Sequence, residues 1–200
     1  ANVLANDIII ARVSFSGIVA SVTTPTGWPL IRKMTTAASG DEHSGEMTSC
    51  VYWRKAGASE PNSWTAAHGD APRPKMAQAV AYRNVDGTSP ILAENSAQDH
   101  NDDGIGTGNV TNTNSKAWRV CSYGAATSFS DSWSGGGDVS ERTDDSTSLS
   151  SSPDIVMSFS DSNGAVSTGT HARTNYLRDS SFFSANGWIG LLRPVTTGPS

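Results

Sequence analysis

The chain has 200 residues, the length of one domain, and 36% are hydrophobic and 16% charged. A net charge of −5 with only four lysines argues against a nucleic-acid-binding protein, which needs a basic face. No apolar run approaches the ~20 residues of a membrane-spanning helix. The 30 Ser and 19 Thr disfavour helices, because hydroxyl side chains compete for backbone hydrogen bonds. This composition indicates short strands joined by turns.

Segments rich in β-branched and aromatic residues, bounded by Gly, Pro, Asn or Asp, predict strands along the chain. In chain order they are Asp7–Phe15, Trp28–Lys33 after a Thr24–Gly27 turn, Cys50–Arg54, Gln78–Val85, Asn109–Thr113, Ala117–Tyr123, Asp154–Ser160 and Trp188–Arg193. No segment keeps a helical spacing of apolar residues for three turns. The pattern predicts one all-β domain over residues 1–200, a jelly-roll-like antiparallel β-sandwich of roughly eight to ten strands.

Alternation along two of these strands predicts which faces form the core. The pleat separates Val51 and Trp53 from Cys50 and Tyr52. In the same way it groups Trp118 with Val120, so we expect Val51/Trp53 and Trp118/Val120 to be the core faces. We also expect Trp28 and Trp188 in the core, because they lie in apolar strands.

The remaining two tryptophans, Trp64 and Trp133, are flanked by Ser, Asn and Asp, and are the candidates for exposed aromatic platforms. Such a ring could stack on a sugar or anchor a protein interface.

Residues 124–152 are mostly Ser, Thr, Gly and Asp, which predicts a long loop or linker. We expect this Ser/Gly/Asp-rich insert, together with the tails Ala1–Asn6 and Thr196–Ser200, to supply contacts with a partner.

One acidic segment matches part of a calcium-loop motif. Asp99, Asn101 and Asp103 have the spacing D-x-N-x-D followed by Gly104, but the twelfth position is Val110 instead of Glu. A polar surface loop is the preferred interpretation, so we expect no metal site.

No catalytic pattern stands out elsewhere. The four histidines share no spacing, no G-x-S-x-G elbow occurs, and Gly104–Gly108 lacks the Lys and Ser/Thr of a phosphate loop. The acidic pairs Asp41-Glu42 and Asp144-Asp145 are typical of solvated loops. We therefore expect no enzymatic activity and no cofactor.

The two cysteines are Cys50 and Cys121, at similar places in two predicted strands. A buried reduced pair is favoured if the protein assembles in the cytosol; a disulfide requires Cα atoms within about 7 Å. No signal peptide is recognisable, and a chain beginning at Ala1 fits either a trimmed initiator Met or a cleaved secretory precursor.

Five blocks, in order, resemble a family of β-sandwich proteins of tailed bacteriophages and prophages that includes minor tail, decoration and minor structural proteins. The blocks are Asp7–Phe15, Pro25–Ile31, Val51–Trp64, Ala79–Pro90 and Trp188–Pro194. Asn84 stands where the family usually has Gly after Ala-Tyr-Arg, and Asn tolerates a left-handed φ better than most residues. The 124–152 insert has no counterpart in the family pattern.

The resemblance implies a non-enzymatic virion protein, foremost a capsid decoration or minor capsid protein, assembled in the host cytoplasm. Its partner would be the major capsid protein, or a tail protein, of the same phage, and it would act as a homo-oligomer such as a trimer. The alternatives are a minor tail protein and a carbohydrate-binding module that uses exposed aromatic rings on a host-surface glycan. The acidic charge balance and the short apolar runs predict neither a nucleic-acid nor a membrane partner.

Overall fold

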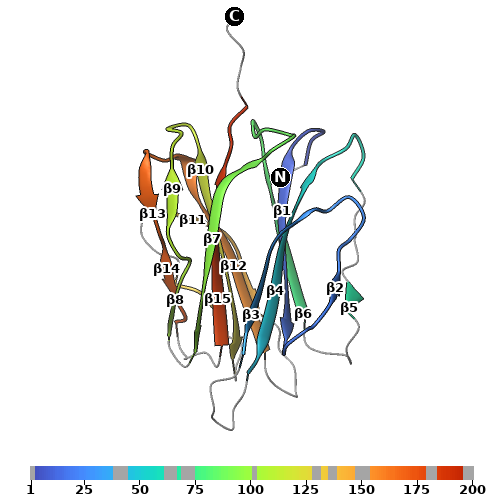
Figure 1. Ribbon diagram of the computed structural model, residues 1–200, viewed down its shortest axis with the longest axis vertical. Helices are drawn as coiled ribbons and strands as arrows, with labels where there is room; N and C mark the ends of the chain where they lie inside the picture. The colour runs from blue at the N-terminus through green and yellow to red at the C-terminus, as the bar shows by residue number, and fades with distance from the viewer. Residues whose placement is uncertain are drawn as a thin grey trace, which may run out of the picture.

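The computed structural model describes residues 3–37, 45–60, 67–68, 75–100, 103–127, 132–134, 139–146, 154–178 and 184–195. Within these ranges the chain forms fifteen strands and no helix. Two antiparallel sheets face one another (Figure 1). The prediction of an all-β antiparallel sandwich is therefore confirmed. The described residues contain no helix long and apolar enough to cross a membrane.

The two main sheets contain nine strands, which agrees with the predicted eight to ten. The first sheet has the order β3 (Leu30–Thr36), β4 (Met47–Lys55), β1 (Ile8–Ser16), β6 (Lys75–Tyr82). The second has the order β11 (Ser140–Ser146), β12 (Asp154–Ala165), β10 (Trp118–Thr127), β15 (Ser184–Leu192), β7 (Ile91–His100).

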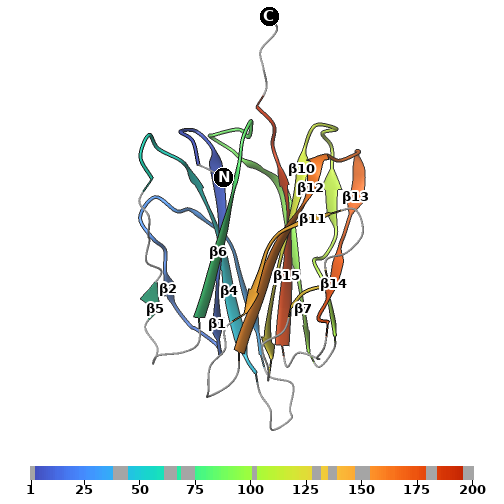
Figure 2. The same ribbon diagram turned by 180° about the vertical axis from the view of Figure 1, so that it is seen from behind.

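Six short strands form three further pairs. They are β2 (Val22–Thr23) with β5 (Ala67–His68), β8 (Gly104–Gly106) with β14 (Thr174–Tyr176), and β9 (Val110–Asn112) with β13 (Gly169–His171). The first pair lies outside the first sheet and the other two lie outside the second sheet (Figures 1 and 2).

These outer strands and loops give the central strands of both main sheets two buried faces. On β1, Ile8 and Ile10 face the second sheet, whereas Ile9 and Phe15 face outward and are also buried. On β10, Val120 faces inward and Tyr123 faces outward against an apolar cluster that includes residues of β8 and β9. The sequence predicted only one core face per strand, because alternation alone does not show what covers the other face.

The predicted core faces are confirmed at three of four positions. Val51 and Val120 are fully buried and Trp53 is half-buried against the same cluster. Trp118 is 37% exposed, so its assignment to the core was wrong. It is the first residue of β10, beside an irregularity in the pairing with β12, at the end where β6 and β12 diverge (Figure 2). The space between the two sheets is therefore not closed at this end.

The predicted turns have the expected backbone. Gly27 has a φ of +78°, and the Trp28 amide donates to the Pro25 carbonyl at 3.0 Å, which delivers a buried Trp28 onto the first sheet. Asn84 has a φ of +59°, the left-handed conformation expected where the family has Gly.

The Ser-rich insert is not simply a loop. Residues 124–127 end β10, and residues 140–146 form β11 at the edge of the second sheet. None of the residues of β11 is fully buried: four are half-buried and three are exposed. Residues 128–131, 135–138 and 147–153 lie outside the described ranges, as do Ala1–Asn2 and Thr196–Ser200 of the two tails.

A charged side chain lies at the centre of the sandwich. Arg12 is fully buried between the sheets, and all its guanidinium nitrogens donate hydrogen bonds. The acceptors are Ser14 Oγ at 3.2 Å, Ser122 O at 2.8 Å and its Oγ at 3.0 Å, Ser49 Oγ at 3.0 Å, Asn186 O at 3.0 Å and Asn186 Oδ1. Gly124 provides the space, because a Cβ there would overlap the guanidinium. Burial lowers the pKa of Arg12 to about 9.

Candidate functional site

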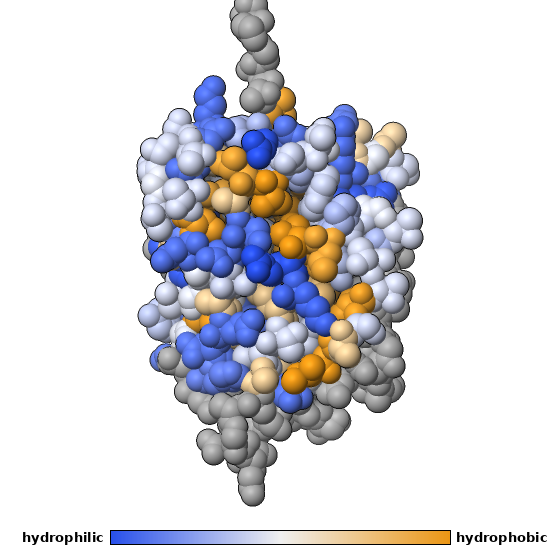
Figure 3. Space-filling view, viewed as in Figure 1, coloured by the Kyte–Doolittle hydropathy of each residue, from blue (hydrophilic) through white to orange (hydrophobic). Residues whose placement is uncertain are grey.

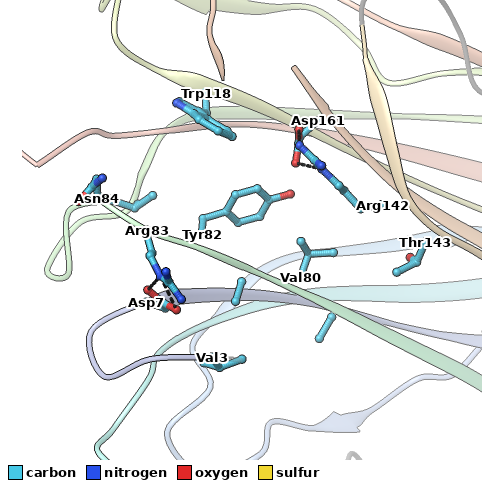
Figure 4. A pocket seen from close by; sticks show the side chains of 13 residues that line it. Val3, Asp7, Val80, Tyr82, Arg83, Asn84, Trp118, Arg142, Thr143 and Asp161 are labelled. Carbon is cyan, nitrogen blue, oxygen red and sulfur yellow. Dashed lines mark hydrogen bonds and ion pairs between the residues drawn. The ribbon is translucent and has the colours of Figure 1, made fainter. Parts of the chain in front are cut away.

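A cleft of about 670 Å³ opens between the two sheets where β6 faces β11 and β12 (Figure 4). Its wall on the first sheet is the upper half of β6 and the turn that follows it. Its wall on the second sheet comes from β10, β11 and β12. Figure 2 shows these strands close together at one end and diverging toward the end at which the cleft lies. The divergence of the sheets therefore creates the cleft.

Two aromatic rings form the centre of the cleft. Tyr82 and Trp118 meet edge to face, with ring centroids 6.4 Å apart and an interplanar angle of 70°. Tyr82 is almost completely buried, whereas Trp118 keeps more than a third of its surface exposed. One ring is thus fixed in place while the other is accessible to a ligand.

An ion pair lies opposite Tyr82. Arg142 Nε donates to Asp161 Oδ2 and Arg142 Nη2 to Asp161 Oδ1, both at 2.7 Å. The hydrogen bonds with Asp161 raise the pKa of Arg142 above its ordinary value. The Asp161 side chain is 1% exposed, and Asn163 holds Arg142 from the other side through a 2.8 Å hydrogen bond. The pair belongs to one sheet, because β11 and β12 are neighbours.

The Tyr82 hydroxyl points toward this ion pair (Figure 4). It is buried, yet it makes no hydrogen bond of good geometry with the described residues. Burial raises the pKa of Tyr82 well above its ordinary value, and the nearby Asp161 carboxylate raises it further. Tyr82 therefore stays a neutral phenol whose hydroxyl is directed at the Asp161 carboxylate.

The turn after β6 continues the site toward the end of the sandwich. Arg83 pairs with Asp7 at 3.2 Å, and the Val195 amide donates to the Asn84 carbonyl at 2.9 Å. Two further hollows, of about 370 and 290 Å³, share Arg83, Asn84 and Val85 with the cleft. Exposed apolar side chains surround them: Val3, Leu4, Trp118 and Val195 are 43%, 50%, 37% and 50% exposed.

We call this region the Arg83 surface. It consists of Val3, Leu4, Asp7, Lys55, Tyr82, Arg83, Asn84, Val85, Lys116, Trp118, Arg142, Asp161 and Val195. The four cationic and two acidic side chains in this set give it a net charge of +2, in a chain whose net charge is −5.

The aromatic platforms predicted from sequence do not form this site. Trp133 is fully buried and packs on Tyr123 with centroids 5.7 Å apart, so it is not an exposed platform. Its amide donates to Asp144 and it bridges to Leu177, which places it in the outer core. Trp64 lies outside the described residues.

The calcium-loop residues are not brought together by the described structure. Asp99 accepts a hydrogen bond from the His100 amide at 2.8 Å, Asp103 lies in the turn before β8, and Asn101 lies outside the described ranges. No cluster of three or more His, Cys, Asp or Glu residues suited to a metal ion occurs in the part of the chain that the structure describes.

Cys50 and Cys121 are both buried and both free. Cys50 lies on the outward face of the first sheet and Cys121 on the outward face of the second. Both sheets separate them, so the two cysteines are not adjacent and the disulfide alternative is excluded for this fold. They occupy equivalent positions on two facing strands, but with both side chains turned away from the interior.

Sequence analysis missed the central residues of the cleft. Tyr82 lay within a predicted strand, Asp161 followed another, and Arg142 lay in the predicted loop. The one usable signal was Trp118, which begins β10 two residues after the polar Lys116, where burial is incomplete. The meeting of Arg142 with Asp161 depends on β11 pairing with β12, which composition did not reveal.

Comparison of the chain with family models, curated proteins and solved structures gives no match.

Proposed function

We propose that this protein is a non-enzymatic structural protein of a tailed-phage particle, foremost a capsid decoration protein, that attaches through its Arg83 surface. The observation that carries the proposal is the concentration of exposed apolar side chains around three adjoining hollows. Protein interfaces are enriched in Trp, Tyr and Arg and centred on pockets, and Tyr82, Arg83 and Trp118 supply all three residue types here. The five sequence blocks supply the link to phage particles.

The shape of the protein supports a role in binding. The central strands of both sheets are buried on both faces, which favours a body that presents the Arg83 surface without rearrangement. A preorganised surface avoids ordering costs on binding. Repetition of weak contacts over a particle lattice then increases the overall affinity through avidity.

The test is cosedimentation of the purified protein with capsids and, separately, with tails of a tailed phage. We expect saturable binding to capsids that Trp118→Ala weakens about tenfold, the effect of losing one interface anchor. Tyr176→Ala is the matched control, because Tyr176 is 49% exposed on β14, away from the Arg83 surface. Equal binding by both variants would contradict the assignment of the surface, and binding to tails alone would identify a minor tail protein.

A second candidate function is carbohydrate binding, which the accessible Trp118 ring favours. Sugar rings stack on exposed aromatic faces, and the Trp118 ring keeps more than a third of its surface exposed. The measurement is titration of bacterial surface polysaccharide while Trp fluorescence is followed. Saturable quenching that is lost in Trp118→Ala would support this function over particle attachment.

A further inference from the structure

The sequence contains two Asn-Gly dipeptides, Asn163-Gly164 and Asn186-Gly187. An asparagine followed by glycine is open to attack on its side-chain amide by the next backbone nitrogen, because glycine has no Cβ to hinder the approach. The two dipeptides therefore share one intrinsic chemistry, and the fold decides whether either of them reacts.

The first dipeptide lies in an irregular and exposed part of β12. Residues 162–164 lie opposite Arg119 alone, because Asp161 pairs with Val120 and Ala165 with Trp118. Asn163 is exposed. It has a φ of +49°, and Gly164 has a φ of +156°. Among the described residues, the space in which a Cβ of Gly164 would lie is open. Water therefore reaches this amide, and no described side chain crowds the backbone next to it.

An arginine contacts the atom at which negative charge would develop. Arg142 Nη2 donates to Asn163 Oδ1 at 2.8 Å, and two 2.7 Å hydrogen bonds to Asp161 hold the guanidinium in place. A fixed cationic donor withdraws electrons from Cγ and stabilises the oxyanion of a tetrahedral intermediate. None of the described residues binds Asn163 Nδ2, so the nitrogen that would leave is unrestrained.

The second dipeptide is held at every point. Asn186 is fully buried in β15, where its Oδ1 also accepts from a guanidinium, that of Arg12. Its Nδ2 donates to Thr36 Oγ1 at 3.2 Å. Gly187 is paired on both sides, with β10 and β7, and the Gly106 carbonyl lies against the position of its missing Cβ. Burial and packing therefore keep both water and the required movement from this site.

We propose that Asn163 deamidates spontaneously in the folded protein, with Arg142 as the activating donor, whereas Asn186 is protected. The Gly164 nitrogen bonds to Asn163 Cγ, the Cγ–Nδ2 bond breaks, and Nδ2 leaves as ammonia with the proton given up by the Gly164 amide. Water then adds to one carbonyl of the cyclic imide and opens it to aspartate or isoaspartate. The reaction needs no co-reactant besides water, and the inference does not depend on the proposed function.

The product changes the wall of the cleft. Deamidation adds one negative charge to a chain whose net charge is −5. In the aspartate product a carboxylate replaces the amide beside Arg142, and its hydrogen bond with the guanidinium becomes an ionic one, which is stronger. Arg142 is then shared between this carboxylate and Asp161, so the aged protein presents a different charge at the Arg83 surface.

The first experiment compares the two dipeptides within one chain. Folded protein and urea-unfolded protein are incubated in mildly alkaline buffer, and their peptides are followed by mass spectrometry. In the folded protein we expect the Asn163 peptide to gain about 1 Da while the Asn186 peptide keeps its mass. In urea both peptides should convert. An unchanged Asn163 in the folded chain would overturn the inference, and so would equal rates at both sites.

The second experiment tests the role of the arginine. Arg142→Gln should slow the conversion of Asn163 about threefold or more, because the oxyanion loses its cationic donor. Arg193→Gln is the matched control, since it removes the same charge from a side chain that binds the Ser89 carbonyl. Thermal melting confirms that both variants are folded during incubation. An unchanged or faster rate in folded Arg142→Gln would overturn the activating role of Arg142.

A third measurement identifies the product. Aged wild type should elute from an anion-exchange column with fresh Asn163→Asp protein, and it should release one ammonia for each chain converted. Ammonia release without conversion of the Asn163 peptide would place the reaction at another amide and overturn the assignment.

Discussion

The sandwich has two open sides, and each carries an arginine–carboxylate pair. On one side the pair joins the two sheets, and on the other it lies within a single sheet. At the side between β3 and β7, Arg32 of the first sheet pairs with Glu94 of the second, with Arg32 Nε 3.0 Å from Glu94 Oε2. Glu94 also accepts from the Trp188 indole at 3.0 Å, and Trp188 is fully buried. At the side between β6 and β12, the Arg142–Asp161 pair stays within the second sheet, and Trp118 is exposed.

The two pairs have the same chemistry, so the difference between the two sides depends on whether the pair joins the two sheets or lies within one sheet. A pair that spans the two sheets draws their edges together and orients a core tryptophan. A pair within one sheet satisfies its own charges and does not hold the two sheets together, so a cleft remains. In Figure 3, hydrophilic side chains cross the middle of the face seen in Figure 1, between apolar areas.

The largest expected difference in stability is between the alanine variants of the two tryptophans, Trp188 and Trp118. Trp188→Ala should lower the free energy of unfolding by about 3–5 kcal/mol, because it empties a fully buried site. Trp118→Ala should cost only about 1–2 kcal/mol, since its ring faces the open cleft. Urea denaturation of both variants measures the difference. Equal losses would show that the cleft is closed in solution.

Removal of the Glu94 carboxylate, which pairs with Arg32 across the two sheets, should have the next largest effect on stability. Glu94→Ala breaks the pair with Arg32 and leaves the buried Trp188 indole without its acceptor, at a cost of about 2 kcal/mol. Glu94→Gln keeps an acceptor for the indole and should cost about half as much. Chemical denaturation separates the two, and the comparison of the sides would fail if neither variant changed stability.

Tyr82→Phe should change the free energy of unfolding by less than about 1 kcal/mol at pH 7, because the hydroxyl that it removes is buried beside the Asp161 carboxylate but lacks a hydrogen bond of good geometry. The pKa of Tyr82 is raised above the ordinary 10.0, so its contribution to stability is complete below pH 10 and is lost as the pH rises beyond that value. Tyr82→Phe should therefore also lose less stability than wild type at high pH. Melting temperatures between pH 7 and 11 test both effects, and a destabilised variant at pH 7 would reveal a partner for the hydroxyl.

The smallest expected effect on stability is that of a glycine in place of Asn84, in the turn beside the cleft. Asn84→Gly should change stability by less than about 0.5 kcal/mol, because glycine adopts the positive φ of this position without strain. Asn84→Val should cost about 1–3 kcal/mol, since β-branched residues disfavour that conformation. Thermal melting distinguishes them; similar losses for both would mean that the Asn84 side chain, rather than its φ, is what the turn requires.

Local patterns predicted much of the fold. Runs such as Asp7–Phe15 and Trp188–Arg193 became central strands, and the turn residues Gly27 and Asn84 adopted the expected φ. The failures share a cause, which is dependence on distant partners. Trp133 is buried because Leu177 and Tyr123 pack around it, and Trp118 is exposed because the two sheets diverge. Neither fact is encoded in the neighbouring residues.

The candidate site was less predictable than the fold for the same reason. Tyr82, Trp118 and Asp161 come from three strands, and Arg142 comes from a segment whose composition indicated a loop. Ser and Thr disfavour helices, but they do not prevent an edge strand when a neighbour such as β12 offers hydrogen bonds.

Arg12 has a consequence for how the two sheets can be assembled. Apolar faces alone could slide past one another by a pleat with little loss of burial. A slide would move the guanidinium from the Ser122 and Asn186 oxygens onto apolar neighbours such as Val120, where an unpaired charge costs several kcal/mol. Arg12 therefore penalises offset packings of the two sheets and favours the alignment in which β6 faces β11 and β12 across the cleft.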